Sequence, residues 1–270
     1  MTMKIEPQNT ADGSADFRKT LLYAHHGWGK TTQAKYYKDM YGPGYILSGE
    51  SGLSSIKDAR IDYNAFYSWD NKIQHAAGKY SFKGLVEDVV NTPEFRQKYK
   101  WIMVDSLTEL GDMSFNHEDA AVQASAKLKK KDANGFELWG NHAANILGAC
   151  KFIRDLPMHV IVTALAKADE DENGAMGHWP MVKGKQVQQQ LPGIFDCVLC
   201  GVRTISADPN NPGVVRLIVT DEYKGWHGKV RDENRTLAAV ELEHNVTNLF
   251  RKMEHSEAKN ATPVAVSTSA

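Results

Sequence analysis

The sequence predicts an α/β fold with a mostly parallel central sheet flanked by helices. Short apolar runs alternate with helical patterns along the 270 residues, and strands that alternate with helices form parallel sheets. One apolar run leads through a glycine-bearing turn into a helix start, and another ends in an aspartate. A chain of this length and apolar content can bury a substantial core.

The predicted elements alternate along most of the chain. The predicted strands are Lys19–Tyr23, Gly44–Ser48, Ala65–Trp69, Trp101–Asp105, Val160–Ala164, Asp196–Val202 and Val214–Thr220. The predicted helices are Thr31–Met40, Phe82–Val90, Glu137–Leu156 and Leu237–Met253. Segments 1–16 and 255–270 are polar or rich in small residues, so we expect disordered tails around a domain of residues 17–254.

Composition excludes several classes of protein. Lys and Arg number 32 against 33 Asp and Glu, a net charge of −1, so the chain is not a globally basic nucleic-acid coat. No run approaches the roughly 18 apolar residues of a membrane span, and the N-terminus lacks an export signal, so we expect a cytoplasmic protein. Cys150, Cys197 and Cys200 are expected to be buried core thiols rather than a zinc or redox site.

The segment from Leu21 to Thr32 has the order of a phosphate-binding loop: apolar strand, glycine-bearing turn, then Lys-Thr at a helix start. Such a turn wraps backbone N–H groups around a β-phosphate, the lysine reaches the β- and γ-phosphates, and the threonine hydroxyl ligates Mg²⁺. The predicted nucleotide-binding residues are Ala24, His25, His26, Gly27, Trp28, Gly29, Lys30, Thr31 and Thr32. Ala24 replaces the usual first glycine, which is tolerated if its φ is negative.

A second motif lies in the strand Trp101–Asp105. An acid at the end of an apolar strand is where a Walker B aspartate would hold Mg²⁺, so Thr31 and Asp105 are the predicted metal ligands. Asp105 follows Lys30 by 75 positions. That spacing leaves room for two further strands and favours the P-loop folds that have an extra strand between the two Walker elements.

With these motifs the chain resembles RecA-like P-loop ATPases over Lys19–Met253. It is most similar to short phage-encoded RecA-core proteins, some of which are linked to single-strand annealing and recombination. The segments that carry the resemblance are the loop 24–32, Ser48–Leu53, Val104–Leu110, Val160–Ala164 and Leu191–Asp196. The resemblance implies a RecA-like core that uses ATP and Mg²⁺, with catalytic roles for Lys30 and Asp105.

The resemblance also implies roles for residues outside the two motifs. Glu50 falls where relatives keep the glutamate that polarises the attacking water; an exposed loop glutamate is the alternative. Arg231 would be a finger toward a neighbouring subunit of a homo-oligomer, with Lys229 and Arg235 as substitutes and solvated charges as the alternative.

One position departs from the family pattern. Leu165 stands where relatives often have a polar residue that senses the γ-phosphate. Thr163 or Lys167 would take over that role.

Two long segments, Gly111–Gly135 and Lys167–Gln190, are expected to be loops in the positions of the two DNA-binding loops of RecA-like proteins. The side chains that would meet phosphates or stack on bases are Lys127, Lys129, Lys130, Lys131, Lys183, Lys185, Trp179 and Phe115. The acidic run 169–172 would repel DNA, so a solvated charged face is the alternative.

The resemblance implies an ATP-hydrolysing protein that acts on single-stranded DNA in phage recombination or replication, inside the bacterial host cell. Phage recombination or replication proteins are the expected partners. Two alternatives stay open. One is an ATP-dependent loader or remodeller of a replication protein, and the other is a non-hydrolysing nucleotide-gated binding module, favoured by Ala24 and Leu165.

Overall fold

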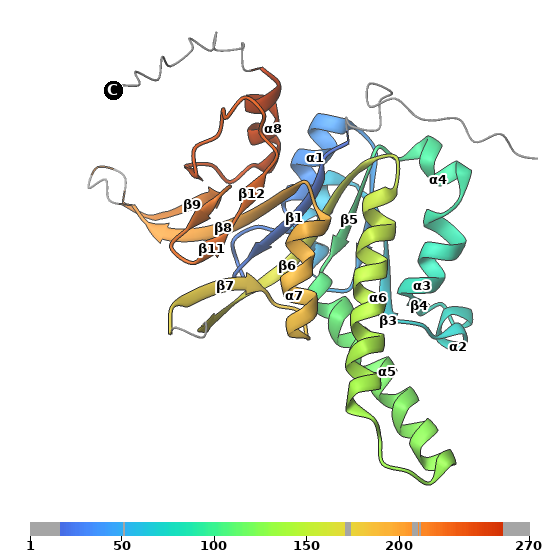
Figure 1. Ribbon diagram of the computed structural model, residues 1–270. Helices are drawn as coiled ribbons and strands as arrows, with labels where there is room; N and C mark the ends of the chain where they lie inside the picture. Colours follow the sequence, from blue (N-terminus) through green and yellow to red (C-terminus); the bar gives the residue numbers. More distant parts are fainter. Residues whose placement is uncertain (1–16, 51, 171–173, 207–209, 211, 256–270) are drawn as a thin grey trace, which may run out of the picture.

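The computed structural model describes residues 17–50, 52–170, 174–206, 210 and 212–255 (Figure 1). The strands are β1 (Lys19–Ala24), β2 (Gly44–Ser48), β3 (Asp62–Ser68), β4 (Tyr80–Ser81), β5 (Trp101–Asp105), β6 (His159–Glu170), β7 (Met176–Pro180), β8 (Cys197–Ile205), β9 (Val214–Val219), β10 (Glu222–Tyr223), β11 (Trp226–His227), β12 (Lys229–Val230) and β13 (Val240–Glu241). The predicted tails lie outside the described residues, apart from His255.

Helices connect most of these strands. The helices are α1 (Gln33–Tyr41), the 3₁₀ helix η2 (Leu53–Ala59), α2 (Lys72–Ala76), α3 (Phe82–Leu85), the π turn η3 (Val86–Val90), α4 (Pro93–Lys98), α5 (Leu107–Lys129), α6 (Gly135–Asp155), α7 (Lys185–Ile194) and α8 (Val246–Glu254). In the part of the chain that the structure describes, no helix combines the length and the apolar character that crossing a membrane requires.

The central sheet has the order β13-β9-β8-β1-β6-β5-β2-β3-β4. All neighbours from β8 to β4 pair in parallel, and β9 and β13 extend the β8 edge antiparallel. Strand β6 lies between β1 and β5, which confirms the extra strand predicted between the two Walker elements. The predicted α/β fold, a mostly parallel central sheet flanked by helices, is likewise confirmed.

Alternating residues of each strand build two apolar layers. Leu21 and Tyr23 of β1 belong to the cluster that includes α3, α6 and α7, whereas Leu22 and Ala24 belong to the cluster with α1 and α8. This period of two is the geometry of a strand buried on both faces. The three cysteines are buried free thiols in this core, as predicted, and the described residues contain no cluster that could hold a metal through His, Cys, Asp or Glu.

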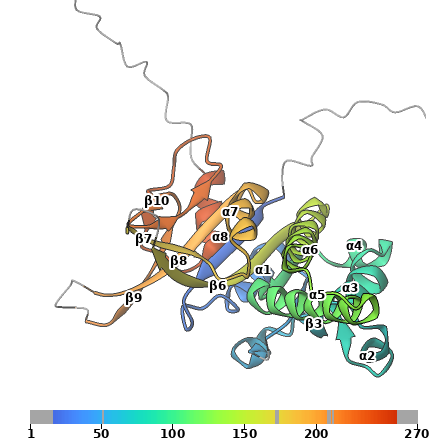
Figure 2. The ribbon, with the colours of Figure 1, turned by 60° about the horizontal axis from the view of Figure 1, so that its bottom comes forward.

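The prediction of a loop at Gly111–Gly135 is wrong. Helix α5 runs to Lys129, and α6 begins after the Asn134 cap, whose Oδ1 accepts bonds from the N–H groups of Phe136 and Glu137. The two helices form a hairpin, here called the helical arm, which projects from the body (Figures 1 and 2). The segment is rich in alanine and lysine, both good helix formers.

The prediction of a loop at Lys167–Gln190 is also wrong. Strand β6 continues to Glu170 and pairs antiparallel with β7, so that Lys167 is the register partner of Trp179, and α7 starts at Lys185. Trp179 stacks on His227 of β11, with ring centroids 4.0 Å apart. A contact between segments so distant in the chain stabilises the hairpin and leaves no local sequence signal.

Two predicted helices differ in extent. The helix expected over Leu237–Met253 begins only at Val246, where Asn245 caps it by accepting from the Thr247 N–H at 2.9 Å. The helix expected over Phe82–Val90 divides into α3 and the π turn. The segment before α8 is tied to the phosphate loop through Gln33, whose side-chain amide donates to the carbonyl oxygens of Gly29 (3.2 Å) and His244 (2.8 Å).

Candidate nucleotide-binding site

The phosphate loop begins where β1 ends at Ala24. Gly27 and Gly29 have φ of +72° and +111°, which glycine adopts without steric penalty. The first turn of α1 closes with bonds from Gln33 N to Lys30 O (3.1 Å) and from Ala34 N to Thr31 O (3.2 Å). A helix start leaves its first N–H groups without intrahelical partners, so this turn is ready to bind an anion.

Lys30 is folded back over the loop. Its ammonium donates to the carbonyl oxygens of Ala24 (3.1 Å) and His25 (3.4 Å), and the residue is 8% exposed. Burial lowers the pKa of Lys30, while the charges of Glu50 and Asp105 oppose that shift. Among the described residues its hydrogen-bond partners are neutral carbonyls, so this buried cation is well placed to receive a phosphate.

Asp105 at the end of β5 lies between two threonines. Its carboxylate accepts from Thr31 Oγ1 at 2.7 Å and from Thr163 Oγ1 at 2.5 Å. Burial raises the pKa of Asp105, and the two hydroxyl bonds partly offset that rise. Mg²⁺ usually takes one or two protein oxygens and keeps the rest of its shell for water and phosphate, so the adjacent Thr31 hydroxyl and Asp105 carboxylate fit such an ion. We call Lys30, Thr31, Glu50 and Asp105 the Walker centre.

Glu50 follows β2, beside β5 in the sheet. The N–H groups of Gly49 and Glu50 donate to the Asp105 carbonyl at 2.7 and 3.3 Å, which ties this loop to the Walker centre. Glu109 in the first turn of α5 is a second acid nearby, and its Cβ would lie 3.2 Å from a Cβ placed on Gly49. Burial, with the negative charges of Glu50 and Asp112, raises the pKa of Glu109.

Trp28 has a different role from its neighbours in the loop. Its side chain is 1% exposed, and the indole N–H donates to the Leu217 carbonyl of β9 at 3.2 Å. A Cβ on Gly201 would lie 2.4 Å from the indole, so only glycine fits beneath it. Trp28 therefore anchors the loop to the sheet and leaves only its backbone for the phosphate cradle, whereas His25 and His26 are exposed.

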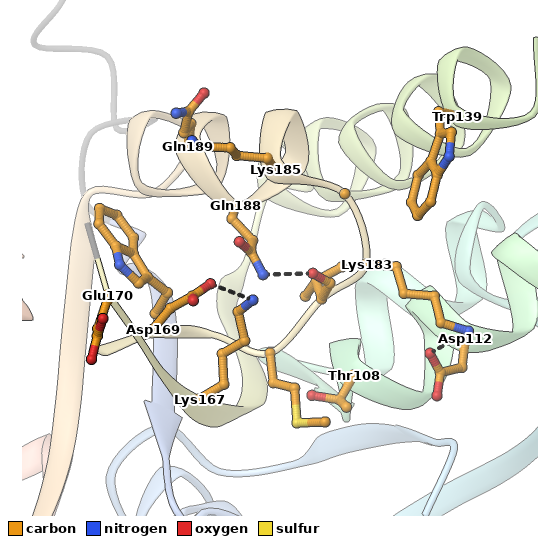
Figure 3. Close-up of a pocket in the computed structure, with 14 residues that line it drawn as sticks. Thr108, Asp112, Trp139, Lys167, Asp169, Glu170, Lys183, Lys185, Gln188 and Gln189 are labelled. Atoms are coloured by element: carbon orange, nitrogen blue, oxygen red, sulfur yellow. Dashed lines mark hydrogen bonds and ion pairs between the residues drawn. The ribbon is translucent and has the colours of Figure 1, made fainter. Parts of the chain in front are cut away.

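A pocket of about 900 Å³ has in its lining Thr108, which follows Asp105 of the Walker centre by three residues (Figure 3). It lies between the first turn of α5, the start of α6, the β6–β7 hairpin and α7. Its lining residues are Thr108, Asp112, Trp139, Lys167, Asp169, Glu170, Trp179, Met181, Val182, Lys183, Gly184, Lys185, Gln188 and Gln189. Thr108 connects the pocket to β6, because the Thr108 Oγ1 accepts a hydrogen bond from the Leu165 N–H at 2.9 Å.

The pocket brings together residues from the two predicted DNA-binding segments. Lys183 pairs with Asp112 at 3.2 Å and lies over the Phe115 ring, 4.5 Å from its centroid. Lys185 and Trp179 also line it, together with the acid Asp169. Residues 171 and 172 of the acidic run lie outside the described residues.

Sequence reasoning missed the pocket residue of α6 and, apart from Lys185, the pocket residues of α7. Trp139, 46% exposed, faces the pocket across from Asp169 and Glu170 (Figure 3). Gln188 and Gln189 come from α7. A tryptophan next to glycine in a helix, as in Trp139-Gly140, is the one local signal that could have indicated an exposed aromatic face.

Two sets of predicted residues, the lysines of the basic run and the finger candidates, lie outside the pocket and away from the phosphate loop. The lysines at 127 and 129–131 lie at the end of the helical arm, not in the pocket. Arg231 pairs with Asp196 at 3.2 Å beside the start of β8, whereas Ala24 pairs with Gly201 further along the same strand. Arg231 is thus distant from the phosphate loop of its own chain, and Lys229 bonds the Pro192 carbonyl.

The two candidate sensors are divided between two places. Thr163 contacts Asp105 in the Walker centre. Lys167 contacts Asp169 at 2.9 Å in the pocket.

Comparison with known proteins agrees with this geometry. A search of curated proteins finds no match. A comparison with protein families matches residues 16–231, well over half of the 270, to the AAA domain. A phosphate loop after β1, an aspartate at the end of β5 and a third strand between them are what that class of ATPase requires. The chain therefore belongs to the AAA domain family of P-loop ATPases.

Proposed function

We propose that this protein is a Mg²⁺-dependent ATPase that binds single-stranded DNA in the pocket beside its Walker centre. The observation that carries the proposal is strand β6, which has Thr163 against Asp105 and, four residues later, Lys167 in the pocket. A ligand that moves this strand alters both places. Phage recombination or replication is the proposed setting, on the strength of the RecA-like resemblance.

In the Walker centre each group has a distinct task. Lys30 and the loop amides bind the phosphates, and Thr31 and Asp105 hold the metal. Bound Mg²⁺ would neutralise charge on the β- and γ-phosphates. Glu50 orients the attacking water, with Glu109 as the second candidate. Arg231, 72% exposed at its side chain, is available to a neighbouring subunit of a homo-oligomer, as is expected of a trans-acting finger.

The pocket suits unpaired nucleotides. Trp139 and Trp179 offer faces for bases, and Lys167, Lys183 and Lys185 offer charge for phosphates. Proteins bind single strands by combining aromatic platforms with a basic groove. Asp112 and Asp169 pair with two of these lysines, so a bound strand would replace carboxylates with phosphates.

A specific observation favours one rival, the loader or remodeller. Leu128 and Phe136 at the end of the helical arm are 86% and 93% exposed, and exposed apolar side chains gathered at one place mark protein-binding surfaces. The non-hydrolysing module is less well supported, because Ala24 fits within β1 and its carbonyl accepts from Lys30.

The test is phosphate release measured with and without a single-stranded oligonucleotide, with binding of the same oligonucleotide measured in parallel. We expect turnover that the oligonucleotide accelerates, and loss of turnover in Lys30→Ala. Turnover without oligonucleotide binding would favour the loader. ATP binding without turnover, at any oligonucleotide concentration, would favour the binding module.

A further inference from the structure

Two arginines face each other on the ribbon formed by β8 and β9. Arg203 and Arg216 are register partners in the antiparallel pairing, so their side chains leave the same face. Both residues are exposed, and among the described residues neither has a hydrogen bond or an ion pair. Like charges directly opposite destabilise a strand pair, so this arrangement gains stability when an anion lies beside it.

Arg203 reaches the phosphate loop. Its Nη1 lies 3.0 Å from the position of a Cβ placed on Gly27. The guanidinium therefore lies beside the turn whose amides form the phosphate cradle. Gly27 also has positive φ, so the absence of a side chain there serves both the turn and the approach of the arginine.

Trp28 fixes the position of the ribbon against the loop. Its indole lies on Gly201, two residues before Arg203 on the same strand face, and its N–H bonds the Leu217 carbonyl next to Arg216. The loop thus holds both strands of the ribbon through its own tryptophan. The ribbon extends beyond the sheet on the side opposite α2 and α4 (Figure 2), and this anchor sets how far Arg203 lies from the phosphate cradle.

We infer that Arg203, supported by the positive charge of Arg216, binds a phosphate group of the nucleotide in its own chain. The inference rests on the proposed nucleotide binding at the phosphate loop. A guanidinium suits this task because its planar fork of N–H donors matches phosphate oxygens. The site then contains a second cation besides Lys30, supplied by a strand outside both Walker motifs.

The test measures binding of Mg·ATP and of inorganic tripolyphosphate to the full chain by calorimetry. Arg203→Gln should weaken both by roughly 10- to 100-fold, the usual loss for a hydrogen bond to a charged group. Arg203→Lys should recover part of the loss, and Arg216→Gln should have a smaller effect of the same sign. Loss with ATP but not with tripolyphosphate would overturn the inference, because the arginine would then contact the base or ribose.

Two controls separate position from net charge. The double variant Arg203→Gln with Thr204→Arg restores the net charge but places the guanidinium on the opposite face of the same strand. It should bind Mg·ATP and tripolyphosphate as weakly as Arg203→Gln does. Recovered affinity would overturn the inference. Arg96→Gln on α4, whose guanidinium bonds Asn91, should bind like the parent.

Lys30→Ala separates this inference from the proposed function. If Lys30→Ala loses binding of both probes while Arg203→Gln binds them like the parent, the role of Arg203 is refuted and the nucleotide site is retained. Parental binding in Lys30→Ala would mean that the nucleotide site itself is misassigned.

Discussion

Strand β6 links the Walker centre to the neighbouring pocket through Thr163 and Lys167, yet the two places are stabilised differently. In the Walker centre, Asp105 is buried and accepts bonds from two threonine hydroxyls. In the pocket, Lys167 and Lys183 pair with partly exposed acids, and pairs of this kind contribute about 0–1 kcal/mol. This difference agrees with the proposed roles, because catalysis requires one fixed geometry, whereas binding a flexible single strand requires charges that change partners at low cost.

The largest effect is expected at Glu50. Glu50→Gln should lower the rate of phosphate release by about 10²–10⁴ and leave Mg·ATP affinity within a few-fold, because the amide cannot accept a proton from water. Glu109→Gln is the matched variant and should retain most of the turnover.

The reverse result would transfer the role of base to Glu109. The pKa of Glu109 is raised. As pH decreases, a rate that depends on ionised Glu109 would therefore begin to fall at a pH above the ordinary Glu pKa of about 4.3. A rate profile against pH, measured in Glu50→Gln, distinguishes the two acids.

Lys30→Ala is expected to weaken Mg·ATP binding by roughly 100-fold, since the variant removes a buried cation from the phosphates. The fold should persist, because within the described part of the chain the ammonium bonds just two loop carbonyls. Lys35→Ala, which breaks an ion pair between α1 and Asp58, is the control and should bind ATP normally. Calorimetry with equal affinity in all three proteins would refute the assignment of the loop.

The pocket tryptophans should matter for DNA and not for ATP. Trp139→Ala and Trp179→Ala should each weaken binding of a labelled single strand by roughly 5- to 150-fold, the equivalent of about 1–3 kcal/mol per stacked base. Phe136→Ala, at the exposed end of the helical arm, should leave anisotropy titrations unchanged. If Phe136→Ala weakens binding and the tryptophan variants do not, the arm is the DNA site.

Asp105→Asn tests the cost of a buried charge. Its folded-state pKa is raised above the unfolded value of about 3.9, so the ionised form destabilises the nucleotide-free fold. That penalty is absent below the unfolded pKa and complete above the folded one. At pH 8 the variant should melt a few degrees above the parent, and the difference should shrink as pH falls.

Mg·ATP provides the complementary measurement on Asp105→Asn. The ligand should raise the melting temperature of the parent more than that of the variant. An equal rise in both proteins would remove Asp105 from the metal site.

The smallest effect concerns salt dependence. Neutralising Lys183 and Lys185 should reduce the log–log slope of single-strand binding by about 0.7 for each DNA phosphate that the protein no longer neutralises. Neutralising Lys129, Lys130 and Lys131 should change the slope less, because those lysines lie at the end of the arm. A larger change from the arm lysines would show that this basic run meets DNA, as its position in the sequence predicts.

The Walker centre was predictable because its parts are local. The phosphate loop follows directly after β1, and Asp105 is the last residue of β5. The parallel topology brings those two strand ends to one edge of the sheet. The pocket was predicted only in part. Lys183, Lys185 and Trp179 were named from a supposed loop, but the β6–β7 hairpin is stabilised by the stacking of Trp179 on His227, a contact between distant segments.

The sequence by itself determined the fold class, the phosphate loop and the acid of β5, because strand and turn signals act over a few neighbouring residues. Only the tertiary structure decided that the basic run lies at the end of a helical arm, that Trp139 faces the pocket and that Arg203 lies beside Gly27. The register of β8 against β1 and β9 positions that arginine. Such register depends on packing across the whole sheet, which no local pattern encodes.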